Sequence, residues 1–402
     1  MADYASFFSD VLIDALVDAT RRVHDAESRL PEAEREDAWH LLSYAFDQDV
    51  AWQETRQLVF ALAPRMELAG FREDWINYLQ TAASRGADHN DLAATAEFEY
   101  QTGLLYRMLT DYERAKSWLN SSRERFALLG DRGGQARVLN ELAWIEQLRR
   151  NYDAATEHVE HALPLLDESA PERGMCYRVQ GMIAIYQGHW EQAERYHRKA
   201  LAIFEQHGDV RKVAWSMVNL AVAQLGQKKL EESITNCSQA CALMHQMGDE
   251  YHLAIAQMNL GLAYYHSHKF DDAVGCYLKS ESIMVRFHDL LRLAEVHLNL
   301  ALAHLAQDHN ELASVSFEYA IHLFKKSGVI SQVINAMDGL AMSYMAQSCF
   351  DKALTILTDA ISMLPQIVNA PNYQYYNQSL NKHLEEATFQ QRIAHVPRAD
   401  VA

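Results

Sequence analysis

The sequence predicts an all-α protein, a solenoid of antiparallel helix pairs with a helical cap at each end. The 402-residue chain has no proline between Pro171 and Pro365, so nearly half of it lacks the residue that breaks helices. Small side chains recur with a constant period within this run, which indicates a repeat architecture. Because a solenoid grows by adding repeats, the length counts repeats and not globular domains.

Residues 1–50 are expected to form an N-terminal helical cap, since a solenoid needs end elements with one polar face. A first amphipathic helix is predicted over residues 5–30, ended by Pro31, with an apolar stripe of Phe8, Leu12, Ala15, Ala19, Val23 and Leu30. A second is predicted over residues 33–47, with Trp39, Leu42, Ala45 and Phe46 as its apolar side chains.

Residues 51–90 are predicted to form a degenerate repeat. Extending the 40-residue register backwards places Ala63 and Ala82 in two of three small positions, whereas Trp75 takes the third. Pro64 falls within the first helix of this unit, where we expect a kink.

Residues 91–365 contain seven repeats with three small positions each. The first position is held by Gly103, Ala143, Gly181, Ala221, Gly261, Ala301 and Ala341. The second is held by Ala115, Ala155, Ala193, Ser233, Ala273, Ala313 and Ala353. The third is held by Ser122, Ala162, Ala200, Ala240, Ser280, Ala320 and Ala360. Forty positions separate successive repeats, except between the second and third, where the step is two positions shorter. Helices approach to about 8–10 Å, and small residues at the crossing allow it, so these positions should be buried.

Residues 366–402 should supply a C-terminal capping helix, over residues 372–392, and a tail. Between helices the repeats often place a Gly-Asp pair: Gly130-Asp131, Gly208-Asp209 and Gly248-Asp249. Glycine provides a left-handed helix end, and aspartate can cap the helix that follows.

The small residues, the aromatic residue before the second helix of five repeats and the paired alanines resemble the tetratricopeptide repeat; the aromatic residues are Tyr112, Tyr152, Trp190, Phe270 and Phe350. The usual unit has about 34 residues, and the 40-residue period is similar to the long-helix variant of kinesin-light-chain-like and bacterial regulatory proteins. The resemblance implies a right-handed superhelix whose first helices line a concave side. It also implies a protein-binding role without enzymatic activity.

A narrower resemblance concerns the segment from Leu30 to Arg35 and the later stretch LAPRMELAGFREDWINYLQTAAS. Both look like the start of tetratricopeptide arrays in bacterial signal-transduction ATPases with numerous domains. The sequence has no GxxxxGK[ST] phosphate loop. The resemblance therefore implies a stand-alone sensor or adaptor portion.

The formal charge of −18 argues against a nucleic-acid partner, because binding phosphates requires a cationic surface. Residues 1–50 alone contribute −8, from 12 acidic and 4 basic side chains. No apolar run is long enough for a membrane span, and acids stand where a signal peptide needs bases. Five cysteines without paired spacing are typical of reduced thiols, so we expect a cytoplasmic protein.

Catalytic and metal-binding motifs are missing, with no GxSxG, HExxH or CxxC pattern. We therefore expect no enzyme and no cofactor. The closest metal-like pairs are His158/His161, His266/His268 and Cys237/Cys241. In this register Cys237 falls at an inward position of the second helix, which favours core packing over metal binding by the pair.

A row of asparagines is the strongest candidate for a binding site. Asn219, Asn259 and Asn299 each precede the first small position by two residues, on the first helices of three consecutive repeats. In the resembled proteins, asparagine at this position hydrogen-bonds the backbone of a bound peptide, and a carboxamide offers both a donor and an acceptor. The alternative is a scaffold role, in which the asparagines link neighbouring repeats.

The neighbours of these asparagines on the expected concave side are apolar or aromatic, with one cation and one histidine. The predicted peptide-binding or partner-binding residues are Arg178, Trp215, Asn219, Met258, Asn259, Leu262, Tyr265, His266 and Asn299.

Three functions are compatible with these features. The first is a non-enzymatic adaptor, scaffold or sensor that binds a partner segment. The second is a peptide-responsive bacterial regulator of the pheromone-receptor type without a DNA-binding head, and the third is an enzyme whose site no motif encodes. The oligomeric state stays open, with a homodimer through a terminal helix as one alternative.

Overall fold

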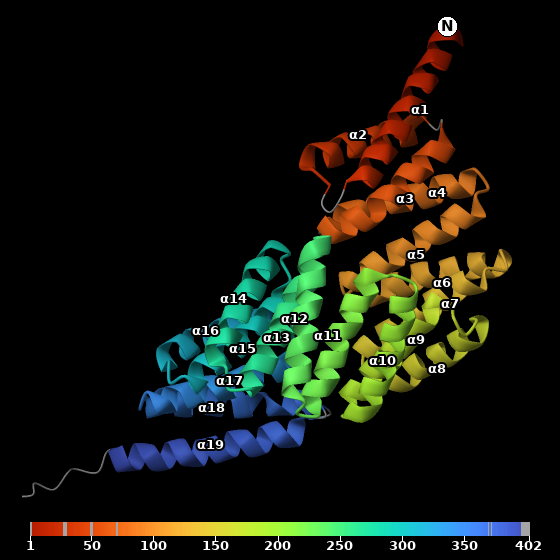
Figure 1. Ribbon diagram of the computed structural model, residues 1–402. Helices are drawn as coiled ribbons and strands as arrows, with labels where there is room; N and C mark the ends of the chain where they lie inside the picture. The colour runs from red at the N-terminus through yellow and green to blue at the C-terminus, as the bar shows by residue number, and fades with distance from the viewer. Residues whose placement is uncertain are drawn as a thin grey trace, which may run out of the picture. The chain divides into compact units, whose positions relative to one another are not determined.

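The computed structural model describes residues 2–26, 30–48, 51–69, 71–368, 370 and 372–394. The chain is 87% helical, and the described residues form 19 α-helices, which pack in consecutive pairs, and no strand (Figure 1). The predicted all-α class is confirmed. The chain divides into two compact units, and each is described by itself. Unit 1 comprises Met1–Lys229 and Ala242–Glu250, and unit 2 comprises Leu230–Cys241 and Tyr251–Ala402.

Eleven of the helices belong wholly to unit 1. They are α1 (Ala2–Asp25), α2 (Glu32–Gln48), α3 (Trp52–Ala69), α4 (Arg72–Asp88), α5 (Leu92–Met108), α6 (Tyr112–Leu128), α7 (Arg132–Leu148), α8 (Tyr152–Ala162), α9 (Pro171–Tyr186), α10 (Trp190–Gln206) and α11 (Val210–Gly226). Each helix from α4 to α7 packs on the next one, and α9 packs on α10 and α10 on α11. The first helices of the repeats also meet one another, because α7 contacts both α5 and α9.

The division between the units passes through α12 (Leu230–Met247). The helices that follow are α13 (Glu250–His266), α14 (Phe270–Arg286), α15 (Leu290–Ala306), α16 (Asn310–Lys326), α17 (Ile330–Ala346), α18 (Phe350–Met363) and α19 (Tyr373–Ala394). Helices α14 to α19 pack consecutively, and α17 also contacts both α15 and α19.

Most turns between the helices of the repeats contain a residue in the left-handed region. Glycine fills this place at Gly130, Gly208 and Gly248, with φ between 66° and 70°. Asp131 and Asp209 then cap the next helices by accepting hydrogen bonds from the N–H groups of Gly134 and Lys212. For these two aspartates, the predicted capping role is confirmed. Other turns use residues with a Cβ, such as Thr110 at φ 63°.

All 21 small positions are buried, as the repeat pattern predicts. Glycine at the first position lies directly against a large side chain of the second helix. A Cβ on Gly103 would lie 2.7 Å from Leu119 Cγ, and one on Gly261 would lie 2.5 Å from Tyr277 Cε1. These distances are too short for carbon contacts, so the missing side chain sets the spacing of each helix pair.

The shortened step between the second and third repeats has a local cause at α8 and α9. Helix α8 ends at Ala162, and a short 3₁₀ turn, Leu163–Leu165, replaces its last turn. Pro171 begins α9, where its missing N–H removes no hydrogen bond, because the first N–H groups of a helix have no partner within the helix. The starts of α8, α9 and α10, at Tyr152, Pro171 and Trp190, are therefore each one position closer together than the helix starts on either side.

The N-terminal helices differ from the prediction in two places. Helix α1 ends at Asp25 and not at residue 30, and Phe8 is exposed although it belongs to the predicted stripe. Leu16, one turn beyond Leu12, is fully buried in its place. Helix α3 contains Pro64 and continues to Ala69.

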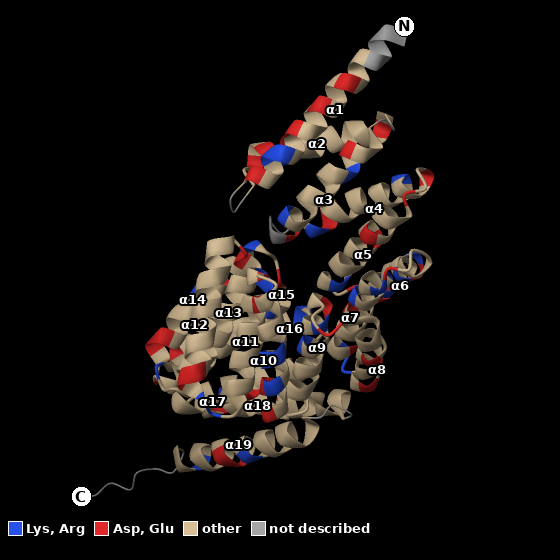
Figure 2. Ribbon diagram, turned by 45° about the vertical axis from the view of Figure 1, so that its right-hand side comes forward, with Lys and Arg blue, Asp and Glu red and all other residues tan. Residues whose placement is uncertain are grey.

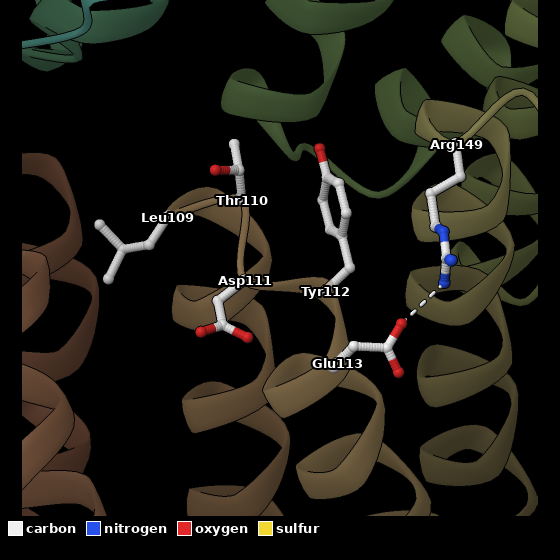
Figure 3. Close-up of a pocket in the computed structure, with 6 residues that line it drawn as sticks. All are labelled: Leu109, Thr110, Asp111, Tyr112, Glu113 and Arg149. Carbon is white, nitrogen blue, oxygen red and sulfur yellow. Dashed lines mark hydrogen bonds and ion pairs between the residues drawn. The ribbon is translucent and has the colours of Figure 1, made fainter. Parts of the chain in front are cut away.

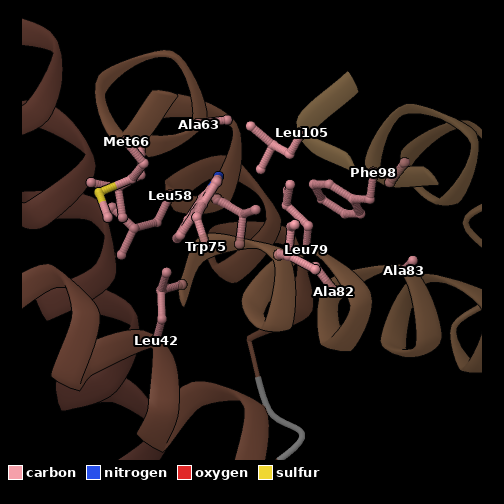
Figure 4. Close-up of a cluster of buried hydrophobic side chains, with 14 of the residues drawn as sticks. Leu42, Leu58, Ala63, Met66, Trp75, Leu79, Ala82, Ala83, Phe98 and Leu105 are labelled. Carbon is pink, nitrogen blue, oxygen red and sulfur yellow. The ribbon is translucent and has the colours of Figure 1, made fainter. Parts of the chain in front are cut away.

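The helix pair α3–α4 accommodates Trp75 where the later repeats have a small residue. Its indole is 1% exposed and lies among Leu58, Met66 and Leu79 (Figure 4). The ring stacks on Tyr78 with centroids 5.7 Å apart and meets the edge of Trp39 of α2 at 6.5 Å. A large side chain fits here because α2 supplies aromatic partners.

The last helix, α19, packs against α17 and α18 in unit 2. Asp338 of α17 accepts hydrogen bonds from Ser379 at 2.7 Å and from His383 Nδ1 at 2.6 Å. The hydrogen bond to Asp338 holds the pKa of His383 above its usual range. The predicted tail comprises residues 393–402; its first two residues belong to α19, and residues 395–402 lie outside the described residues.

Charge and hydropathy add two further observations. Acidic side chains stand along α1 and α2 (Figure 2). Within the described ranges, every helix is too short or too polar to cross a membrane.

Candidate functional site

The three asparagines of the predicted row lie on α11, α13 and α15, the first helices of their repeats. All three are partly exposed. Asn219 belongs to unit 1, whereas Asn259 and Asn299 belong to unit 2. We therefore describe the row as two separate parts.

None of these carboxamides is seen to bond a neighbouring repeat among the described residues of its unit. Asn259 donates to the carbonyl of Ile255 on its own helix, at 2.9 Å. Within the described part of its own unit, neither Asn219 nor Asn299 has a hydrogen-bond partner. The inter-repeat bonds that a scaffold role requires are not found within the described residues of either unit.

Asn140, unlike the three asparagines of the row, makes a hydrogen bond to a neighbouring repeat. Its amide nitrogen, on α7, donates to the carbonyl of Glu172 on α9 at 3.2 Å, and the side chain is 2% exposed. An asparagine that links neighbouring repeats in this protein is therefore buried, unlike Asn219, Asn259 and Asn299.

The predicted apolar neighbours in unit 2 divide into buried and accessible side chains. Met258 is 9% exposed and packs in a cluster with Tyr277, which leaves it little surface for a partner. Leu262 and Tyr265 are partly exposed, and His266 is exposed. The Tyr265 and His266 rings meet edge to face at 5.5 Å, and burial lowers the pKa of His266 below its usual range.

In unit 1, Arg178 of α9 lies between two indole rings. Its guanidinium carbon is 4.4 Å from the ring centroid of Trp144 on α7 and 5.0 Å from that of Trp215 on α11. The Arg211 guanidinium covers Trp215 as well, at 4.7 Å. Cations over an indole face are attracted by the quadrupole of the ring. We call Trp144, Arg178, Trp215 and Arg211 the arginine–tryptophan stack.

The carboxylates near the stack are engaged with other arginines. Glu141 of α7 accepts from Arg107 Nε at 2.7 Å. Arg211 pairs with Glu67 at 2.8 Å and with Asp249 at 2.9 Å. Arg178 itself has neither a hydrogen bond nor an ion pair in the described residues, and burial lowers its pKa to about 10.

An open hollow of about 480 Å³ lies at the turn between α5 and α6 (Figure 3). Its polar groups already have structural roles. Asp111 caps α6 through the N–H of Arg114, and Glu113 pairs with Arg149 at 3.0 Å. This hollow is therefore a weaker candidate than the face formed by the first helices.

The histidine and cysteine pairs that the sequence offers as metal ligands do not belong to a larger ligand cluster in the described residues. In the ranges that the structure describes, no three His, Cys, Asp or Glu side chains gather as a metal site would require. Cys237 and Cys241 are buried in the core, as predicted, and burial raises the pKa of Cys237.

Sequence reasoning identified Arg178 and Trp215 but missed Trp144, Arg107 and Arg211. These side chains do not occupy equivalent places in successive repeats, so the 40-residue period gives no signal for them. The signal that remains is the presence of Trp and Arg on consecutive first helices.

These observations define a class of protein, an α-helical repeat protein whose first helices carry the candidate binding residues. Residues 91–168 and 171–250 match the tetratricopeptide repeat family model, so these segments are tetratricopeptide repeats. No match is found among the curated proteins.

Solved structures share the fold at low sequence identity. One is the Signal Transduction ATPase with Numerous Domains (STAND) protein with a tetratricopeptide repeat sensor from Pyrococcus horikoshii, at 16% identity and a TM-score of 0.60. The alignment covers 95% of this chain, which spans 60% of the length of that protein. The predicted resemblance to such arrays is confirmed at the level of fold.

Two further structures align over most of both chains. A Rap protein complexed with competence and sporulation factor has 13% identity and a TM-score of 0.55, with 87% of this chain and 99% of that chain covered. Aspartyl phosphate phosphatase F from Bacillus subtilis has 13% identity and a TM-score of 0.51, with 88% and 93% covered. The tetratricopeptide fold indicates a role in protein–protein interaction.

Proposed function

We propose that this protein is a non-enzymatic adaptor, scaffold or sensor that binds an extended peptide or partner segment along its first helices. The observation that carries the proposal is the hydrogen-bonding state of the asparagine row. Asn219 and Asn299 are partly exposed and make no hydrogen bond within the described residues of their units. A free carboxamide can bond a peptide unit without any sequence requirement.

The proposal assigns residues 91–365 to seven binding repeats and residues 51–90 to a degenerate one. Residues 1–50 and 366–402 act as caps that shield the ends of the solenoid. The proposed partner-binding residues form two separate sets, Arg178, Trp215 and Asn219 in unit 1 and Asn259, Leu262, Tyr265, His266 and Asn299 in unit 2, where Met258 packs beneath the surface. We further propose a cytoplasmic signalling role in a bacterium.

A second candidate is a peptide-responsive regulator of the pheromone-receptor type without a DNA-binding head. It is favoured by the fold shared with a Rap protein that was solved with competence and sporulation factor bound. That alignment covers 87% of this chain and 99% of that chain.

The test is a double variant, Asn219→Ala with Asn259→Ala, against a partner isolated by affinity capture from the native host. We expect binding to weaken at least about fivefold, since each lost hydrogen bond contributes about 0.5–1.5 kcal/mol. The melting temperature should stay nearly unchanged.

Asn140→Ala is the matched control, because Asn140 bonds the neighbouring repeat and is buried. It should lower the melting temperature and leave binding intact. If the double variant instead lowers the melting temperature and keeps its affinity, the asparagine row is a scaffold and the proposal is wrong.

A further inference from the structure

Arg178 is a buried cation whose guanidinium has no carboxylate partner. Its side chain is 8% exposed, and in the described residues it forms no hydrogen bond or ion pair, with Nε fully enclosed. A buried charge without a partner is costly, and most buried arginines are paired. The two indoles that flank it provide attraction to the ring faces but no hydrogen-bond acceptor in the plane of the guanidinium.

The surrounding charges leave this guanidinium unsatisfied. Glu141 is the acid whose field most favours the charged form of Arg178, and it is held by Arg107. The other two acids, Glu67 and Asp249, are both directed at Arg211. The N–H groups of the Arg178 guanidinium are thus hydrogen-bond donors that no acceptor among the described residues uses.

The edge of the stack reaches solvent on the first-helix side of unit 1. Trp144 and Trp215 are partly exposed, and the side chain of Arg211 is 24% exposed. Asn219 lies one helical turn after Trp215 on α11, so both occupy the same helix face. The unsatisfied donors therefore belong to the face that carries the proposed peptide site.

We propose that the arginine–tryptophan stack is a carboxylate-recognition site, in which Arg178 pairs with an acidic group of the bound peptide between the Trp144 and Trp215 rings. This inference rests on the proposed function and specifies the chemistry of its ligand. A planar guanidinium matches a carboxylate through two parallel hydrogen bonds, and the indoles fix its plane. The carboxylate comes either from an Asp or Glu side chain or from the C-terminus of the peptide.

The two sources are separated with synthetic random octapeptide libraries, one with a free C-terminal carboxylate and one amidated. Immobilised full-length protein selects from each library, and the selected peptides are sequenced and their affinities measured. Enrichment of Asp or Glu at one position of the amidated library assigns the side-chain source. Binding that is confined to the free-acid library, without such enrichment, assigns the C-terminal source.

Two substitutions at Arg178 connect the selection to the stack. Arg178→Met keeps the apolar contact with both indoles and removes the donors, and we expect affinity for the selected peptides to fall at least about tenfold. Arg178→Lys keeps the charge but loses the planar fork, so an intermediate loss is expected. Far-UV circular dichroism checks that both variants fold, and the lysine variant still tests the site if the methionine variant does not.

Arg137→Met is the control, because Arg137 also lies on a first helix but is paired with Glu97 at 2.6 Å. It should leave the affinity for the selected peptides unchanged. If peptides bind wild type without a carboxylate preference, or bind the Arg178 variants equally well, the carboxylate site is wrong while the proposed function survives. If no peptide from either library binds wild type, both proposals fail.

Discussion

The contact between Gly261 and Tyr277 offers a quantitative test of how side-chain volume sets the spacing of a helix pair. A Cβ on Gly261 of α13 would lie 2.5 Å from Cε1, 2.8 Å from Cδ1 and 3.0 Å from Cζ of Tyr277 on α14. Carbon atoms prefer separations of about 3.5–4.0 Å, so the ring or the helix would have to move by about 1 Å. Tyr277 is 1% exposed and has no free space to enter.

Two opposing effects decide the stability of Gly261→Ala. Replacing glycine within a helix by alanine gains about 0.5–1 kcal/mol, whereas overpacking a core costs about 1–3 kcal/mol. Because the clash is with an enclosed ring, we expect overpacking to win, with a net loss of about 0.5–2 kcal/mol. Gly275→Ala is the matched control in the same helix pair. Nothing lies within 4 Å of its added Cβ, so it should gain about 0.5–1 kcal/mol.

A second substitution should reverse the sign of the stability change that Gly261→Ala causes. With Tyr277→Leu in place, the smaller and more flexible side chain can move aside for the added methyl, and Gly261→Ala should then stabilise the protein by about 0.5–1 kcal/mol. The resulting Ala/Leu pair stands at the repeat positions that Ala341 and Leu357 hold in the last repeat, where both residues are fully buried.

The assay is urea unfolding followed by circular dichroism. All seven tryptophans lie in unit 1, so tryptophan fluorescence provides an internal reference that a change in unit 2 should leave almost unmoved. The reasoning is refuted if Gly261→Ala stabilises the protein as much as Gly275→Ala does. It is also refuted if the effect of Gly261→Ala is the same with Tyr and with Leu at position 277.

Two further predictions concern the end of unit 2 and the turns. The pKa of His383 is raised, first by its hydrogen bond to Asp338, so its stabilisation of α19 is complete below the ordinary histidine pKa of 6.5 and is lost as the pH rises through the raised value. Amide exchange in α19, corrected for the intrinsic effect of pH on exchange, should therefore show stronger protection at pH 5.5 than at pH 8.5, and His383→Gln should remove this difference. Thr110 is a β-branched residue at φ 63°, so Thr110→Gly should stabilise the protein by about 1 kcal/mol in thermal unfolding. No gain in melting temperature would show that this turn is not strained.

Much of the fold could be predicted because its determinants are local and periodic. A small residue recurs where helices cross, and all 21 such positions are buried. The exceptions arise where a neighbour supplies something that the period does not encode. Trp75 fits a small position because Trp39 and Tyr78 surround it. The repeat pattern pairs Phe317 with Ala301 of its own repeat, but the Phe317 ring lies against Gly339 of α17.

The candidate site could be predicted only in part. The asparagine row is periodic, so its place on the first helices follows from the sequence, whereas its hydrogen bonds do not. That Asn259 bonds its own helix while Asn140 bonds the next repeat depends on which carbonyl lies within reach.

The sequence by itself determined the helix pairs, their register and the helices that carry the candidate binding residues, because each 40-residue repeat places similar side chains in the same packing positions. Only the tertiary structure decided that Arg178 lies between Trp144 and Trp215 and pairs with no carboxylate among the described residues. These three residues come from three helices, and neither interval between them along the chain matches the repeat. Which charge pairs with which depends on distances of a few ångströms between helices, and a repeat pattern does not specify those distances.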